Sequence, residues 1–249
     1  MLRFRLFFSV LFFFPALFSL AQDARDVIKK ADDKAKGKSS QAIMTIQIIR
    51  PSWTREMSLK TWSKGNDLAL ILITAPVKDK GIVYLKRKKE VWNWIPTIER
   101  NIKLPPSMMG QSWMGTDFTN DDLVKEASIV EDYNHSFLAD AAIDGRDCYL
   151  VQMIPKPEAA VVWGKVLLWV DKKEFLMLHG EYFDESGKLV NTLHASDVKL
   201  LGGRMLPARL EMVPNDKKGN KTILLYRELS FDKPIADEVF STQYMSKVQ

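Results

Sequence analysis

The sequence of residues 91–123 reads VWNWIPTIERNIKLPPSMMGQSWMGTDFTNDDL and contains three of the seven tryptophans of the chain. Trp92 and Trp94 lie two residues apart in strand-like sequence, so their side chains should share one side of a strand. An irregular segment follows, in which Gly110 and Gly115 separate apolar, adaptable side chains. These side chains are Met108, Met109, Trp113, Met114 and Phe118. The segment has two interpretations: a movable flap over an apolar cavity, or a plug in an ordinary core.

The sequence on both sides of this stretch is typical of antiparallel strands. From Ser40 the apolar residues recur with a period of two, which places Ala42, Met44, Ile46 and Ile48 on one face. Helical periodicity is almost absent from there on, which disfavours alternating strands and helices in a parallel sheet. Turn-forming residues recur at Pro51-Ser52, Gly65-Asn66, Asp144-Gly145, Ser186-Gly187, Gly202-Gly203 and Lys218-Gly219-Asn220. This pattern predicts a mainly β fold built as an antiparallel meander.

Two helices are predicted. The first runs from Asp23 to Lys36 and ends at Gly37. Its apolar residues recur at spacings of three and four, and they are Ala24, Val27, Ile28 and Ala31. The second is short and should begin near Thr119 or Asn120, capped by those side chains.

The N-terminus has the three zones of a cleaved export signal. Two arginines precede an apolar run over residues 6–14, and Ser19-Leu20-Ala21 forms the predicted cleavage site. Pro15 interrupts the apolar stretch before it reaches the length of a membrane anchor. We therefore expect residues 1–21 to be a signal peptide and residues 22–249 to form one soluble, exported β domain. Without the two arginines the chain is weakly basic, which disfavours nucleic acid as a partner.

Residues that could carry catalysis are scattered. The histidines at 135, 179 and 194 have no metal-ligand spacing, and Cys148 lies in a strand pattern typical of a buried thiol. The acidic group at Asp117 and 120–122 fits a helix start better than a calcium loop. We therefore expect no catalytic residue, no metal site and no cofactor. The basic run Lys86–Lys89 has two interpretations: a solvated strand end, or a docking surface.

The central stretch resembles the LolA-like family of outer-membrane lipoprotein-sorting proteins. A W-x-W-x-P strand, a basic and apolar strand, a Met/Gly loop ending in G-[ST]-D-F and an acidic helix start follow one another in the order of that family's signature. The matching residues are Trp92, Trp94, Pro96, Gly115, Thr116, Asp117, Phe118, Asp121, Asp122 and Leu123. GRMLPARLEMVP, residues 203–214, is similar to the late strand of the family.

The resemblance implies a strongly curved, incomplete antiparallel β-barrel of about eleven strands. An N-terminal helix and short helices should cover its open side, and its hollow face should be apolar. In LolA this hollow shields the acyl chains of a lipoprotein as it crosses the periplasm. A large apolar hollow suits that task, since each buried methylene contributes ~0.8 kcal/mol.

The function implied by the resemblance is a periplasmic, non-enzymatic carrier that binds a lipid or the acyl chains of a lipoprotein in an apolar cavity. Transient membrane contact and an inner-membrane transporter complex as a partner would fit this role. The alternative is an accessory or sensor subunit that docks onto an envelope transporter or regulator. The cavity and its flap should be formed by Trp92, Trp94, Met108, Met109, Trp113, Met114 and Phe118. For the arginine that lines the cavity of LolA, Arg50, Arg55 and Arg100 are equal candidates.

Overall fold

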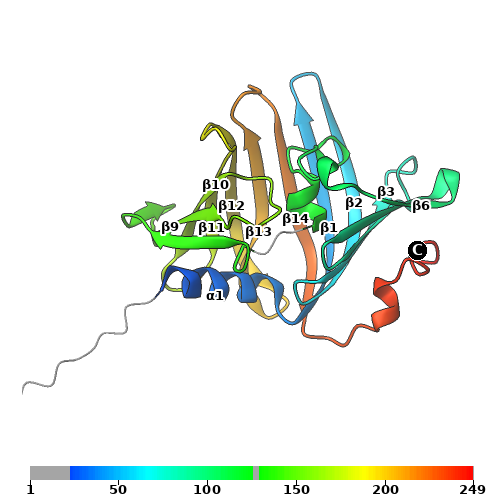
Figure 1. Ribbon diagram of the computed structural model, residues 1–249, viewed down its shortest axis with the longest axis horizontal. Coiled ribbons are helices and arrows are strands. Elements are labelled where there is room, and N and C mark those ends of the chain that lie inside the picture. Colours follow the sequence, from blue (N-terminus) through cyan, green and yellow to red (C-terminus); the bar gives the residue numbers. More distant parts are fainter. Residues whose placement is uncertain (1–22, 126–128, 249) are drawn as a thin grey trace, which may run out of the picture.

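The chain folds into one continuous antiparallel sheet that curves around an open interior (Figure 1). The computed structural model describes residues 23–125 and 129–248. The predicted signal peptide and its cleavage site lie outside these residues. The sheet has 14 strands, in the order β6-β5-β4-β3-β2-β1-β14-β13-β12-β11-β10-β9-β7, and β8 pairs with β9 beside that path. The predicted mainly β fold of LolA type, an open curved sheet with few helices, is therefore confirmed.

The sheet consists of two halves that are joined where the first strand pairs with the last. The first half contains β1 (Ser39–Arg50), β2 (Trp53–Lys64), β3 (Leu68–Ala75), β4 (Val83–Arg87), β5 (Glu90–Ile95) and β6 (Arg100–Lys103). The second half contains β7 (Tyr133–Phe137), β8 (Ala141–Ile143), β9 (Arg146–Pro155), β10 (Lys165–Asp171), β11 (Met177–Phe183), β12 (Leu189–Leu201), β13 (Arg204–Pro214) and β14 (Lys221–Phe231). The β1–β14 pairing runs from Ser40↔Phe231 to Ile49↔Lys221.

The expected count of about eleven strands was wrong. Three strands are short: β6, which corresponds to the basic and apolar strand implied by the resemblance, has four residues, and β7 and β8 have only five and three. So short a strand shows too few alternations of apolar and polar residues to be recognised in the sequence. Two of the three, β6 and β7, lie at the edges of the sheet, where one neighbour is enough to hold them.

The long strands follow the predicted alternation. Ala42, Met44, Ile46 and Ile48 are all buried on one face of β1. Its hairpin partner β2 follows after Pro51-Ser52, and Arg50 pairs directly with Trp53 across that turn. The predicted glycine turns also join consecutive strands. Gly202, for example, has a positive φ, a backbone conformation that glycine adopts without the steric cost other residues have.

The predicted N-terminal helix is α1 (Ala24–Lys36), which crosses the sheet beneath the strands of its second half (Figure 1). Asp23 caps it by accepting a hydrogen bond from the amide of Arg25, and Gly37 ends it with a φ of 65°. The predicted apolar face is buried: it consists of Ala24, Val27, Ile28 and Ala31. Among the described residues, no helix is long and apolar enough to cross a membrane.

The second predicted helix is a single turn, η4 (Asp121–Lys125). Thr119 and Asp122 cap it reciprocally: the amide of Asp122 donates to Thr119 Oγ1 at 3.1 Å, and the amide of Thr119 donates to Asp122 Oδ2 at 2.8 Å. Asn120 does not take part in the cap, because its side chain donates to the carbonyl of Met108 at 2.8 Å. Four further single turns are η1 (Pro96–Ile98), η2 (Pro106–Met108), η3 (Trp113–Gly115) and η5 (Asp237–Phe240).

Both faces of β3 are buried, which accounts for its unbroken apolar sequence. Ile71 and Ile73 pack on the inner face, the face that also meets residues 104–124. Leu70 and Leu72 pack on the opposite, outer face, where the C-terminal segment 235–248 covers them. The C-terminal segment runs along the outside of the first half of the sheet (Figure 1). A third cluster lies between α1 and strands β9 and β10.

Candidate ligand-binding cavity

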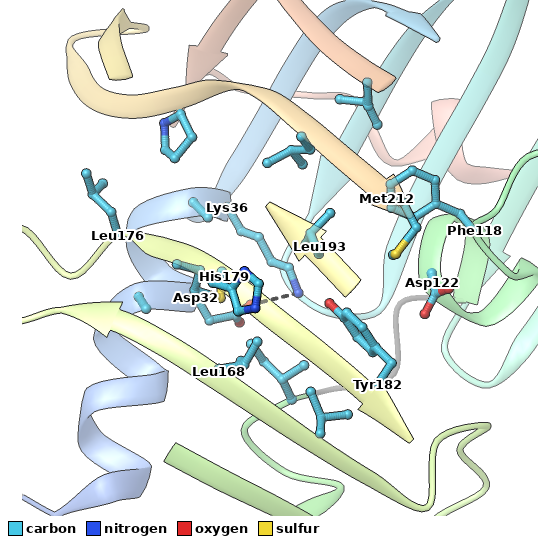
Figure 2. Close-up of a pocket in the computed structure, with 18 of the residues that line it drawn as sticks. Asp32, Lys36, Phe118, Asp122, Leu168, Leu176, His179, Tyr182, Leu193 and Met212 are labelled. Atoms are coloured by element: carbon cyan, nitrogen blue, oxygen red, sulfur yellow. Dashed lines mark ion pairs between the residues drawn. The ribbon is translucent and has the colours of Figure 1, made fainter. Parts of the chain in front are cut away.

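A cavity of about 310 Å³ lies between α1 and the inner face of the second half of the sheet. Figure 2 shows side chains from the helix, from η4 and from strands β10 to β13 that converge on it. Most of its wall is apolar, and its aliphatic lining includes Val166, Leu168, Leu193, Leu210, Met212 and Leu224. The helix contributes Ala31 and Ala35, whose small side chains leave space between α1 and the sheet.

One wall of the cavity carries an ion pair. Lys36 Nζ lies 2.9 Å from Asp32 Oδ1, one turn away on α1. The Lys36 side chain extends from the helix into the cavity, where the ion pair is drawn in Figure 2. Because the side chain of Asp32 is only 6% exposed, the pair lies mostly away from water. The ammonium group thus already has a carboxylate partner before any ligand enters.

The opposite end of the cavity carries Asp122. Its Oδ1 accepts a hydrogen bond of 2.8 Å from the indole nitrogen of Trp163, and its Oδ2 accepts the capping bond from Thr119. Burial raises the pKa of the Asp122 carboxyl, and the hydrogen bonds from Thr119 and Trp163 oppose that rise. Trp163 therefore connects the helical turn η4 to the cavity wall.

Two tyrosines line the cavity near this carboxyl. The ring of Tyr182 on β11 packs against Trp163 with centroids 5.3 Å apart, and its hydroxyl points into the cavity (Figure 2). Tyr133 on β7 is only 4% exposed. Burial, reinforced by the charge of Asp122, raises the pKa of both phenols. Both therefore remain protonated hydrogen-bond donors at neutral pH.

The seven residues predicted for the cavity and flap fall into three places. Phe118 lines the cavity. Met109 and Trp113 are buried against the inner face of the first half of the sheet, and Met108 and Met114 pack beside them. Trp113 is only 1% exposed, and its ring centroid lies 5.5 Å from that of Tyr84. The Met/Gly loop therefore fills the first half of the interior, next to the cavity.

Trp92 and Trp94 share one side of β5, as the spacing predicts, but that side is the outer face. They pack beside Leu85 and Val83, their cross-strand neighbours, in the cluster that contains the C-terminal segment. Neither contributes to the wall of the cavity as described by residues 23–125 and 129–248.

The three arginine candidates are also placed outside the cavity wall. Arg50 Nη1 lies 2.9 Å from Asp117 Oδ2, and Arg50 Nη2 donates to the carbonyl of Gly115 at 2.8 Å. Arg55 donates to the carbonyl of Met114 at 3.0 Å. Both arginines thus hold the Met/Gly loop against the sheet, while Arg100 lies exposed on edge strand β6. Asp117, which the sequence suggested for a helix start, is the ion-pair partner of Arg50 instead.

The basic run is divided by the end of β4. Lys86 is buried on the strand, whereas Arg87, Lys88 and Lys89 are exposed at the β4–β5 turn. Lys88 has a φ of 55°, so this turn is tight. Cys148 is buried, as its sequence pattern predicts. Within the described part of the chain, no group of three or more His, Cys, Asp or Glu side chains could hold a metal ion.

Sequence reasoning missed most of the cavity wall. Leu193, Leu210 and Met212 occupy ordinary inward positions of long strands, and nothing in their alternation shows which part of the inner face stays unfilled. The available signal was the small face of the helix, where Ala31 and Ala35 fall one turn apart. The site therefore depends on how the helix crosses the sheet, which is a tertiary property.

The fold agrees with solved structures that this chain is similar to. A family model described as "Uncharacterized protein" matches residues 65–247, and the chain belongs to that family. Its LolA-like character is confirmed by the crystal structure of a LolA superfamily protein from Nitrosomonas europaea. That protein is 26% identical, with 90% of this chain and 100% of that chain covered and a TM-score of 0.79.

Two further crystal structures have the same fold. A domain from Vibrio parahaemolyticus described as an outer membrane lipoprotein-sorting protein is 19% identical, with 90% and 98% of the two chains covered and a TM-score of 0.80. A DUF1329 family protein from Desulfovibrio piger is 23% identical, with 89% and 97% covered and a TM-score of 0.80. No curated protein matches the sequence.

Proposed function

We propose that this protein is a periplasmic, non-enzymatic carrier that binds a lipid or the acyl chains of a lipoprotein in the cavity under α1. The observation that carries the proposal is the apolar wall between the helix and the inner face of β10 to β14. A LolA superfamily fold shared with a lipoprotein-sorting domain supports it. Burial of an acyl chain in such a wall contributes ~0.8 kcal/mol per methylene, which favours apolar ligands over small polar ones.

Export is supported by the N-terminal sequence, and the periplasm as the place of action is supported by the likeness to a lipoprotein-sorting domain. The positive and apolar zones before Ala21 direct export, and residues 22–249 would then act as one domain in the periplasm. A water-soluble carrier is needed there, because an acyl chain released from one membrane must be shielded before it reaches another.

The direct test is to fill the cavity. Leu193 on β12 is half-buried and lines the wall, so the indole of Leu193→Trp should occupy the space of a ligand. We expect the affinity for the uncharged apolar dye Nile red to fall at least about tenfold, the equivalent of ~1.4 kcal/mol. The matched control is Leu200→Trp on the same strand, where the leucine is 68% exposed and the wall is not altered.

Fluorescence titration of Nile red with the three proteins decides the outcome. The proposal predicts binding by the original protein and by Leu200→Trp, and weak binding by Leu193→Trp with an unchanged circular dichroism spectrum. Equal binding by all three proteins would show that the dye does not use the cavity. Absence of binding to the original protein would refute the carrier function.

We propose that the partners are an acylated lipoprotein and an inner-membrane transporter complex. The exposed turn at Arg87, Lys88 and Lys89 would contact the transporter. Three adjacent positive charges favour an acidic protein surface. Replacing the three residues with glutamate should abolish co-purification with the transporter and leave Nile red binding unchanged. An accessory or sensor subunit, the alternative role, would instead retain its complex after the cavity is filled by Leu193→Trp.

A further inference from the structure

The cavity contains hydrogen-bond donors that have nothing to bind within the described chain. The hydroxyl of Tyr182 points into the cavity in Figure 2, and Tyr133 lines the same wall. Within residues 23–125 and 129–248, neither phenol makes a hydrogen bond. A ligand that fills the cavity shields these hydroxyls from water, so a ligand that supplies an acceptor oxygen to them gains affinity over one that does not.

The position of Tyr182 is fixed by its surroundings. Its ring rests on Trp163, which is itself held by the 2.8 Å hydrogen bond to Asp122. Gly180, two residues earlier on β11, lies so close that an added Cβ would come within 3.3 Å of the Tyr182 hydroxyl. The phenol is thus a preorganised donor, and little side-chain freedom is lost when it binds a ligand.

The charges around the cavity argue against an anionic ligand. The lining contains three carboxylates (Asp32, Asp121 and Asp122), one lysine, and His179, whose pKa is lowered by burial so that the ring is neutral at neutral pH. That lysine is Lys36, which is already paired with Asp32. A fatty-acid carboxylate would therefore lose its hydration and meet carboxylates without a free cation to balance it. An uncharged oxygen acceptor does not have this disadvantage.

We propose that the cavity selects acyl chains carried as esters or amides, whose carbonyl oxygen accepts a hydrogen bond from Tyr182, and discriminates against free fatty acids. This inference rests on the proposed carrier function and specifies its ligand class. Tyr133 provides a second donor to the same head group, and the aliphatic wall takes the chain. Glycerolipids and the acylated N-terminus of a lipoprotein share this chemistry.

Displacement of Nile red by three ligands of the same chain length tests the selection. The ligands are methyl palmitate, palmitate and hexadecane, and the protein is the full chain without its signal peptide. We expect methyl palmitate to bind at least about tenfold more tightly than palmitate at neutral pH. Tyr182→Phe removes only the hydroxyl and should weaken methyl palmitate about three- to tenfold, as expected for one hydrogen bond, without changing the affinity for hexadecane.

The matched control is Tyr244→Phe, the same change in the C-terminal segment on the outer face, which should alter none of the three affinities. If Tyr182→Phe folds poorly, Tyr133→Phe gives the same comparison. A dipalmitoylated lipopeptide and dipalmitoylglycerol, used as further displacers, distinguish the two sources of the ester.

The outcomes separate the two proposals. Palmitate binding as tightly as methyl palmitate, or an equal loss of hexadecane and ester affinity in Tyr182→Phe, overturns the selection for esters and leaves the carrier function intact. Failure of Nile red and of all three ligands to bind overturns both.

Discussion

Asp122, a buried carboxyl in the cavity wall, should make the stability of the folded protein depend on pH. Its pKa is raised by burial above the ordinary aspartate value of 3.8. The folded chain therefore binds this proton more tightly than the unfolded chain, and the contribution of Asp122 to stability falls as pH rises through the interval between the two values. Above that interval, the folded state contains a buried charge stabilised by Trp163 and Thr119.

Replacing this carboxyl with a neutral amide should change that dependence. Asp122→Asn cannot ionise, so we expect the stability of the variant relative to the original protein to improve from pH 4 to neutral pH. The measurement is the urea midpoint of both proteins across this range. Asp184→Asn is the control, because Asp184 is exposed and its pKa is lowered by hydrogen bonds from Ser186. A constant difference between Asp122→Asn and the original protein would contradict the assignment.

The ion pair between Arg50 and Asp117 is the other residue-scale feature with a large predicted effect. The two side chains are only 12% and 4% exposed, so removal of one leaves a buried charge. We expect Asp117→Asn to lower the free energy of unfolding by about 3 kcal/mol. The comparable change Asp197→Asn breaks the exposed pair with Lys199 and should cost less than about 1 kcal/mol. Urea unfolding measures both, and equal costs would show that the loop is not held by Arg50.

At the scale of elements, the C-terminal segment functions as a cover for the outer face of β3 to β5. Phe240, which is 2% exposed, lies in the same cluster as Leu70 and Leu85, and Asn101 on β6 donates to the carbonyl of Thr242 at 3.1 Å. The tryptophans at 92 and 94, on β5, pack against the same cluster. Their place in the fold is therefore explained by packing of the C-terminal segment.

Truncating a buried side chain of the C-terminal segment should destabilise the protein and change its tryptophan fluorescence. Phe240→Ala should lower the free energy of unfolding by about 3–5 kcal/mol, because it leaves a cavity in a closed cluster. The emission should also shift to longer wavelength as water reaches Trp92 and Trp94. Val77→Ala, at a valine that is 91% exposed, should change neither quantity. An unshifted spectrum in Phe240→Ala would contradict the packing of the segment on these tryptophans.

The sequence predicts the bounds of long elements well, but it does not predict which face of a strand turns inward. The helix α1 and strand β1 are long and periodic, and their caps and turns are local, so the sequence predicts their bounds within a residue. The face of a strand that turns inward is not local. The spacing of Trp92 and Trp94 shows that they share a side. Because β3, two strands away in the sheet, is apolar on both sides, only the path of the C-terminal segment decides which side is outer.

At the scale of the whole molecule, two different segments cover the inner face of the curved sheet. Residues 104–124 occupy the first half, where Met109 and Trp113 close the interior. The helix α1 spans the second half (Figure 1), and the cavity lies between this helix and the sheet. The sequence predicted the curved sheet, the helix and the apolar loop, because each follows from local pattern or from the family signature. It could not predict that the loop and the cavity occupy different halves.

This division gives the interior of the protein a filled half and a hollow half. The loop is tied to the sheet by Arg50 and Arg55, whereas the cavity wall is formed by α1 on one side and by strand residues on the other.

An acylated ligand that occupies the cavity between α1 and the sheet should stay bound during purification, where native mass spectrometry would detect it. The protein and its two variants Leu193→Trp and Leu200→Trp are purified from the periplasm without detergent and weighed intact. We predict that the original protein and Leu200→Trp carry additional mass that fragments to an acyl ester or amide, and that Leu193→Trp does not. An original protein without bound lipid, or a Leu193→Trp variant with the same bound mass, would contradict the claim.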